Sequence, residues 1–264
     1  MSSTLVFFGS SDYSVPVLQK LLDSQVNVIS VVTTPDKPVG RHLKLTPNPV
    51  KILARKNNIP VIKDLSEIIN HKSLFINHPV ALVAAYGKII PQEILDTFHN
   101  RIFNIHPSLL PKYRGASPLQ QQILDGIKDS GVTIIQIDAR MDHGPIVAQE
   151  KDVILPEDTT RTLGTRLFAK GADLFINEVL LKIRNLKLKI QADSQATYTK
   201  KLTRESGYVE YSQFKKFLDF GTCDLDISRM FRAFAGWPGL WTTNPKGERI
   251  RLVSLNPLLI RISN

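Results

Sequence analysis

The sequence predicts an α/β protein: a doubly wound, mostly parallel sheet followed by a short C-terminal β unit. Short continuous apolar runs, such as LVFF at 5–8 and VALVAAY at 80–86, alternate with segments of helical periodicity. This alternation is typical of strands buried on both faces of a sheet. Ligands bind beyond the carboxyl ends of such strands, so we expect a site in the loops after residues 9, 34, 86, 106 and 138.

The predicted elements follow one another along the chain. The first apolar run ends at Gly9 and leads into a helical pattern through Val15, Leu18 and Leu21. A β-branched run predicts a second strand over 26–34, which Pro35 ends, and the third strand stops at Gly87. We expect further helices at about 49–57, 91–98, 117–127 and 158–182, and further strands at about 101–106, 132–138 and 146–153.

Three parts are expected: a main domain over 1–182, a basic linker over 183–207 and a small β unit over 208–264. The small unit contains a helical pattern at about 225–235 and then a hairpin-like stretch with Pro-Lys-Gly at its turn. Its aromatic residues are expected to form its core rather than a platform for stacked bases; they are Phe231, Phe234, Trp237 and Trp241.

Composition and short motifs exclude several protein classes. The single cysteine, Cys223, cannot form an internal disulfide, and metal-binding Cys/His spacing is absent, so we expect a reduced compartment and no metal. The sequence shows neither a basic signal-peptide n-region nor an apolar stretch near the roughly 18 residues of a membrane span. This predicts a cytoplasmic protein without a membrane partner, and we expect a monomer. Neither GxGxxG nor a Walker A loop follows the first strand, so NAD and ATP are discounted.

The net charge of +10 is concentrated in two stretches. Residues 34–51 carry Lys37, Arg41, Lys44 and Lys51 against Asp36 alone, and residues 182–204 carry seven cations against one aspartate. Such clusters suit a polyanion such as RNA, although a solvated surface is the alternative.

The stretch RIFNIHPSLLPKYRGASP at 101–118 carries the clearest chemistry. Side chains alternate faces along a strand, so Asn104 and His106 share one face near its carboxyl end. His106 exchanges protons near neutral pH, and Asn104 can donate hydrogen bonds to a developing oxyanion. Together they suit acyl transfer through a tetrahedral intermediate, whereas a satisfied polar pair is the alternative.

A carboxylate that orients His106 is expected in the loop of GVTIIQIDARMDHGPI at 131–146. Asp142 is the first candidate and Asp138 the second, and spacing alone does not choose between them. Cys223 lies in the small unit and no GxSxG elbow is present, so direct transfer between two bound substrates fits better than a covalent acyl-enzyme.

These residues resemble the folate-dependent formyltransferase superfamily. The pattern is Asn-x-His at Asn104 and His106, then SLLPKYRGASPLQ, then GVTI and MDHGPI with Asp142. Within that superfamily the segment PDKPVGRHLKLTPNPVKILA at 35–54 resembles the loop that the tRNA enzymes insert toward the acceptor end. ATYTKKLTRESGYVEY and RAFAGWPGLWT resemble the entrance to their C-terminal domain, so the resemblance covers essentially the whole chain.

The resemblance implies that 10-formyltetrahydrofolate donates a formyl group to the α-amino nitrogen of methionine on initiator tRNA. It implies folate contacts at Ser108, Leu109, Leu110, Pro111, Ala85, Tyr86 and Gly87, and tRNA contacts at Arg41, Lys37 and Lys44. Lys112 and Arg114 either meet a phosphate or the folate tail, or lie on a solvated loop. The implied C-terminal domain is an open β-barrel of the oligonucleotide-binding type that binds tRNA. Such a barrel has about five strands, and 208–264 has room for about two or three, so it is expected to be partial.

Other functions fit the same residues less well. A formyltransferase of this fold that acts on an amino sugar or on glycinamide ribonucleotide should lack the basic, Pro-rich pattern at 35–51. A formyltetrahydrofolate hydrolase would use water in place of the amine. An inactive RNA-binding relative would not need Asn104, His106 and Asp142 together.

Overall fold

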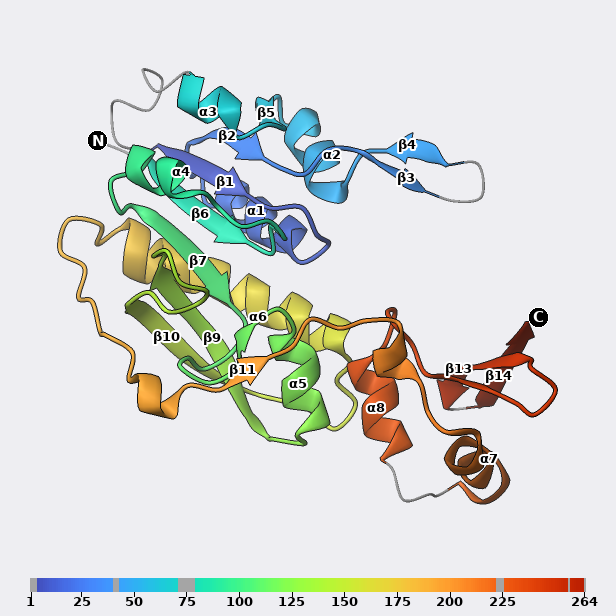
Figure 1. The fold of residues 1–264 in the computed structure, drawn as a ribbon. Helices are drawn as coiled ribbons and strands as arrows, with labels where there is room; N and C mark the ends of the chain where they lie inside the picture. The colour runs from blue at the N-terminus through green and yellow to red at the C-terminus, as the bar shows by residue number, and fades with distance from the viewer. Residues whose placement is uncertain (1–3, 40–42, 71–78, 222–225, 256, 264) are drawn as a thin grey trace.

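A seven-stranded sheet with helices on both faces forms the centre of the protein (Figure 1). The structure is a computed structural model that describes residues 4–39, 43–70, 79–221, 226–255 and 257–263. The strand order is β10-β9-β7-β6-β1-β2-β5; the last five of these are parallel, and β9 and β10 run antiparallel to their neighbours. The predicted doubly wound, mostly parallel sheet is therefore confirmed.

Strands and helices alternate along most of the main domain. In chain order its elements are β1 Leu5–Phe8, α1 Ser14–Asp23, β2 Val28–Val32, β3 Lys37–Val39, β4 Lys44–Thr46, α2 Pro49–Lys56, β5 Val61–Ile62, α3 Ser66–Asn70, β6 Val80–Ala84, α4 Gln92–Thr97, β7 Ile102–His106, β8 Arg114–Gly115, α5 Pro118–Leu124, β9 Asp129–Gln136, β10 Ile146–Val153 and α6 Thr160–Leu174, which continues as a π-helix over Phe175–Leu180.

Burial on both faces explains the continuous apolar runs. Along β1, Leu5 and Phe7 pack into the core beneath α1, α2 and α6, whereas Val6 and Phe8 pack into the core beneath α3 and α4. A strand with both faces covered gains from apolar residues at every position, and this is why its sequence does not alternate.

Two parts of this domain differ from expectation. The segment at 35–54, which resembles an inserted loop and is expected to be helical only from about 49, contains the antiparallel hairpin β3–β4, which projects away from the sheet (Figure 1). The sequence does not predict strand β5 or helix α3, because elements of two and five residues are too short for a periodic signal.

The connecting segment after the main domain runs back along it. Strand β11 Tyr198–Thr199 pairs in parallel with β8, and single 3₁₀ turns lie at Asp193–Gln195 and Glu205–Gly207. The segment therefore contacts the loop that follows β7.

The C-terminal unit has two helices and a three-stranded antiparallel sheet. Its elements are α7 Tyr211–Phe220, α8 Ile227–Ala233, β12 Trp241–Thr243, β13 Arg249–Leu255 and β14 Leu258–Ser263. Phe214, Ile227 and Phe234 pack with Leu119 and Leu163 of the main domain in one apolar cluster. The sequence does not predict helix α7.

The aromatic residues of this unit divide between core and surface. Phe234 is buried and Phe231 packs beside it, as expected, and Trp241 is half-buried. Trp237, expected in the core, is instead 57% exposed, because it lies at the turn between α8 and β12. Within the described ranges, no helix is long and apolar enough to cross a membrane.

Candidate active site at the carboxyl end of the sheet

Strand β7 presents an amide and an imidazole on one face. Asn104 is half-buried and His106 is 4% exposed, while Phe103 and Ile105 point into the core on the opposite face. In register, Asn104 lies between Val83 of β6 and Ile135 of β9. In the described part of the chain the Asn104 side chain makes no hydrogen bond, so both of its N–H groups are available to a ligand.

Both ring nitrogens of His106 have a partner. Nε2 lies 2.9 Å from the carbonyl oxygen of Tyr113, and Nδ1 lies 3.5 Å from Oδ1 of Asp142. A carbonyl oxygen only accepts, so Nε2 carries a proton and donates it to Tyr113. Oδ1 of Asp142 faces Nδ1, so the carboxylate positions the ring and can accept from Nδ1 when that nitrogen carries a proton. The arrangement is suited to holding and moving one proton.

The carboxylate beside His106 belongs to Asp142, not to Asp138. Asp142 has a left-handed backbone (φ +50°), and its Oδ2 accepts a hydrogen bond from the backbone N–H of Gly115 at 2.8 Å. Asp138 is engaged elsewhere, because its Oδ2 lies 2.5 Å from Nδ1 of His143. The structure thus identifies Asp142, and not Asp138, as the carboxylate beside His106, a choice that spacing in the sequence leaves open.

A buried polar network holds the backbone of Asp142. The side-chain Nε2 of Gln191 donates to the carbonyl oxygens of Asp142 and Gly144, at 2.9 and 2.8 Å. Its Oε1 accepts two hydrogen bonds from Arg114, which also donates to Asp193 at 2.9 Å. The hydrogen bond from Arg114 holds the pKa of Asp193 below its ordinary value. Arg114 is 1% exposed, so its assignment to a phosphate, a folate tail or a solvated loop is wrong: it is a structural anchor.

Gly115 links this network to the connecting segment. Its φ of +113° is a conformation that L side chains rarely adopt, and an added Cβ would lie 2.6 Å from the carbonyl oxygen of Thr199 on β11. The backbone N–H that fixes Asp142 is thus held by the close approach of β8 and β11.

Replacing Gln191 by leucine should loosen Asp142 and weaken the fold. The change removes one of the partners of the Arg114 guanidinium and the side-chain donor to two carbonyl groups, and we expect a loss of about 2–4 kcal/mol in unfolding free energy together with a lower kcat. Urea unfolding and steady-state kinetics measure the two effects. Gln195→Leu, an exposed position in the same segment, is the control. Parent-like stability and kcat for Gln191→Leu would contradict this role.

The residues expected at the folate differ in exposure. Ser108 and Leu110 are buried: Ser108 Oγ donates to the carbonyl of Lys112 at 2.7 Å, and Leu110 packs with Ile135 and Ile146. Leu109 and Pro111 are half-buried.

The second loop expected to contact the folate, Ala85–Gly87, is strongly bent. Ala85 and Gly87 both have positive φ angles, +47° and +80°. Tyr86 between them is buried against Phe8, and within the described residues its hydroxyl has no hydrogen-bond partner. Burial raises the pKa of Tyr86.

The hairpin β3–β4 carries two of the three residues expected to contact tRNA. Lys37 and Lys44 are exposed; Lys37 opposes Thr46 and Lys44 opposes Val39, so both lysines share one face. Arg41 lies outside the described residues.

The base of this hairpin is firmly anchored. Asn48 donates to Thr33 Oγ1 and to the carbonyl of Thr34, and Lys51, 1% exposed, pairs with Asp36 at 2.5 Å. The hydrogen bond from Lys51 lowers the pKa of Asp36.

Sequence reasoning misses Gln191, Gly115 and the Tyr113 carbonyl. Gln191 lies 49 residues beyond Asp142, within a stretch that stands out only by its charge. The sequence gives little indication of the other two. Gly115 appears only as a glycine within PKYRGASP, and the role of the Tyr113 carbonyl does not depend on its side chain.

Known proteins resemble the chain over nearly all of its length. The profile of the formyl transferase family matches residues 3–179. The methionyl-tRNA formyltransferase of Coxiella burnetii is 37% identical over 247 residues, which cover 92% of this chain and 76% of that protein. The enzyme of that name from Thermus thermophilus is 38% identical over 256 residues, covering 96% and 80%. The N-formyltransferase of Helicobacter canadensis, solved with folinic acid and dTDP-3-aminofucose, shares the fold at a TM-score of 0.67 and 22% identity, covering 96% and 88%.

Proposed function

The chain belongs to the formyl transferase family, and we propose that it transfers the formyl group of 10-formyltetrahydrofolate to the α-amino group of methionyl initiator tRNA. The observation that carries the proposal is the cluster of Asn104, His106 and Asp142 at the carboxyl end of the sheet. Two relatives at 37–38% identity are named methionyl-tRNA formyltransferase, and this supports methionyl-tRNA as the proposed substrate.

The mechanism follows from what these side chains can donate and accept. An α-amino group has a pKa of about 8, so a useful fraction is neutral at pH 7 and its lone pair can attack the formyl carbon. The C=O electron pair moves onto oxygen, where the N–H groups of Asn104 stabilise the charge. His106, positioned by Asp142, moves a proton from the attacking amine to the departing folate nitrogen as the C–N bond breaks.

The co-substrate is proposed to lie beside Ser108–Pro111 and Ala85–Gly87. The amide of Asn104, which has no partner among the described residues, and the bent backbone at Ala85 and Gly87 suit a ligand with several hydrogen-bonding groups. The Helicobacter canadensis enzyme, which was solved with folinic acid, supports a formylated folate as the donor.

A direct assay tests the substrate assignment. Formyltetrahydrofolate is supplied with methionyl initiator tRNA, charged elongator tRNA, a nucleotide-linked amino sugar, glycinamide ribonucleotide, or buffer alone, and formyl transfer is followed. We expect product with the initiator tRNA. Product with only a sugar or glycinamide ribonucleotide, or release of formate in buffer alone, would replace the proposal by the corresponding alternative.

We propose that Lys37, Arg41 and Lys44 contact the phosphates of the tRNA. Arg41→Ala should raise the KM for tRNA and reduce its salt dependence, with a slope in log K against log salt lower by about 1 per contact. Lys37→Gln with Lys44→Gln should act in the same direction. Folate binding, measured by fluorescence, should stay unchanged, and its loss in Arg41→Ala would refute this role.

The wider assignments rest on the same proposal. Residues 1–182 act as the catalytic domain, 183–207 as the connector and 208–264 as a partial tRNA-binding domain. We further propose that the chain acts as a monomer in the cytoplasm, where charged tRNA is present.

A further inference from the structure

The ring proton of His106 has two acceptors to choose between when the imidazole is neutral. The carbonyl oxygen of Tyr113 lies 2.9 Å from Nε2, and Oδ1 of Asp142 lies 3.5 Å from Nδ1. A neutral ring carries one N–H, so it donates to only one of the two. The shorter contact favours the proton on Nε2, and it leaves a lone pair on Nδ1, where a further proton can bind.

Tyr113 presents this carbonyl from an unfavourable backbone conformation. Its φ of +63° lies in the left-handed region, which bulky side chains rarely adopt. Such a conformation persists only where neighbouring groups hold it. The phenol of Tyr113 is held by Asp125, and burial together with this hydrogen bond raises the pKa of Tyr113 to about 12. The backbone needs partners of its own.

Thr197 of the connecting segment supplies these backbone partners. Its Oγ1 accepts a hydrogen bond from the N–H of Tyr113 at 2.8 Å, and its carbonyl oxygen accepts one from the N–H of Arg114 at 2.8 Å. Its own N–H donates to the carbonyl of Pro111 at 3.4 Å. One residue therefore holds the turn on both sides of Tyr113, from a position 84 residues further along the chain.

The pairing of β11 with β8 keeps Thr197 beside this turn. Thr199 on β11 donates through Oγ1 to the carbonyl of Arg114 at 3.2 Å. Side chains alternate along an extended segment, so Thr197 and Thr199 both face the turn. The N–H of Gly115 in the same turn donates to Asp142, so the turn that Thr197 holds contacts both the imidazole and the carboxylate of the site.

We propose that Thr197 is a positioning residue for His106. By holding the left-handed backbone of Tyr113, it keeps the ring proton on Nε2 and leaves Nδ1, which faces Asp142, as the nitrogen that exchanges the catalytic proton. The inference rests on the proposed function, because it assigns a part in that proton transfer. The amine proton moves to Nδ1 and then to the folate nitrogen that keeps the electron pair of the broken C–N bond, while the proton on Nε2 stays bonded to Tyr113.

Thr197→Val tests the inference. The variant keeps the shape of the side chain and both backbone hydrogen bonds, and it removes the hydroxyl that holds the N–H of Tyr113. We expect kcat for formyl transfer to fall about five- to tenfold, which is the population shift that the loss of one hydrogen bond produces, and KM to stay within about twofold. Thr197→Ser, which keeps the hydroxyl, should restore kcat. Because Thr197 is exposed, both variants should melt within about 5 °C of the parent.

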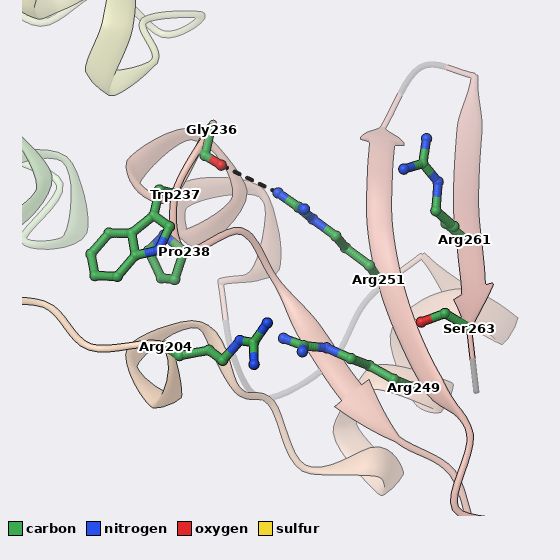
Figure 2. A pocket seen from close by; sticks show the side chains of 8 residues that line it. All are labelled: Arg204, Gly236, Trp237, Pro238, Arg249, Arg251, Arg261 and Ser263. Carbon is green, nitrogen blue, oxygen red and sulfur yellow. Dashed lines mark hydrogen bonds between the residues drawn. The ribbon is translucent and has the colours of Figure 1, made fainter. Parts of the chain in front are cut away.

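Thr203→Val is the matched control. Thr203 is exposed on the same segment, and its side chain hydrogen-bonds Glu205 on the surface. This part of the segment faces the C-terminal unit: the carbonyl of Arg204 accepts the indole N–H of Trp241 at 3.0 Å, and the Arg204 side chain points toward Arg249 at a pocket of about 270 Å³ (Figure 2). The control loses a hydrogen bond of the same kind away from the turn, so it should keep the parent kcat.

The ring nitrogens of His106 give a readout that does not depend on activity. In a proton–nitrogen NMR spectrum of the histidine rings, at a pH where His106 is neutral, the parent should show a protonated Nε2 and an unprotonated Nδ1. Thr197→Val should show a mixture of the two tautomers, and Thr197→Ser the parent pattern.

The outcomes separate this inference from the proposed function. A protonated Nδ1 in the parent would overturn the inference, and so would a parent-like spectrum or a parent-like kcat in Thr197→Val. Equal losses in Thr197→Ser and Thr197→Val would also overturn it, and unfolding of Thr197→Val would assign the residue to the fold instead. A parent that shows the Nε2 tautomer but formylates only a sugar or glycinamide ribonucleotide would overturn the function and leave the inference intact.

Discussion

Replacing His106 by alanine is expected to lower kcat for formyl transfer by about 10²–10⁴ while leaving the protein folded. In the proposed mechanism the imidazole both takes and gives a proton, and such a role contributes about this factor. The ring makes one short hydrogen bond, to Tyr113, so its removal should cost about 1–3 kcal/mol of the folding free energy, which is less than the total stability of a typical domain. Single-turnover kinetics and thermal unfolding measure the two effects.

A second variant separates the two roles of His106. His106→Asn keeps an N–H donor and loses the imidazole ring. If His106 acts mainly by stabilising the oxyanion, the variant should retain part of the parent kcat; if it acts mainly by proton transfer, the variant should lose as much kcat as His106→Ala. His99→Asn, at an exposed histidine before β7, is the control. Activity within about tenfold of the parent for His106→Ala would show that the catalytic assignment is wrong.

Removing the amide of Asn104 should cost about 10²–10³ in kcat, with a small change in the KM for either substrate. In the proposed mechanism its N–H groups meet an oxygen whose charge develops only as the amine attacks, so their stabilisation should be larger in the transition state than in the ground state. Asn104→Ala removes the donors. Asn104→Asp keeps the shape and places a negative charge there, and it should be the slower of the two because like charges repel.

The control for Asn104 is a second amide on the surface. Asn185→Ala, in the exposed stretch after the π-helix, should leave kcat unchanged. If Asn104→Ala raised KM and left kcat intact, the amide would serve ground-state binding and not the oxyanion.

The parts of the site that lie on one strand could be predicted from the sequence. Asn104 and His106 share a face because side chains alternate, and a strand of a parallel sheet ends where ligands bind. Fold class followed from equally local signals, namely apolar runs separated by helical periodicity.

Contacts between distant segments could not be predicted. Asp142 and Asp138 are four residues apart in one loop, so sequence spacing does not distinguish them. Their different positions depend on contacts that include the Gly115 N–H for Asp142 and the His143 ring for Asp138. Arg114 resembles a surface cation in the sequence because its three partners, Gln191, Asp193 and Tyr198, lie 77 to 84 residues further along. Trp237 resembles a core residue because it is large and aromatic. It lies in a turn, where no periodic pattern in the sequence indicates which side chains are exposed.

The pairing of β11 with β8 has a consequence for protein synthesis. A nascent chain that has emerged only as far as residue 182 already contains Asn104, His106 and Asp142. It lacks Gln191, which bonds the backbone of Asp142, and Thr199, which packs against Gly115, whose N–H bonds the carboxylate. Catalytic competence should therefore arise late, when the connector has left the ribosome and settled against the folded sheet.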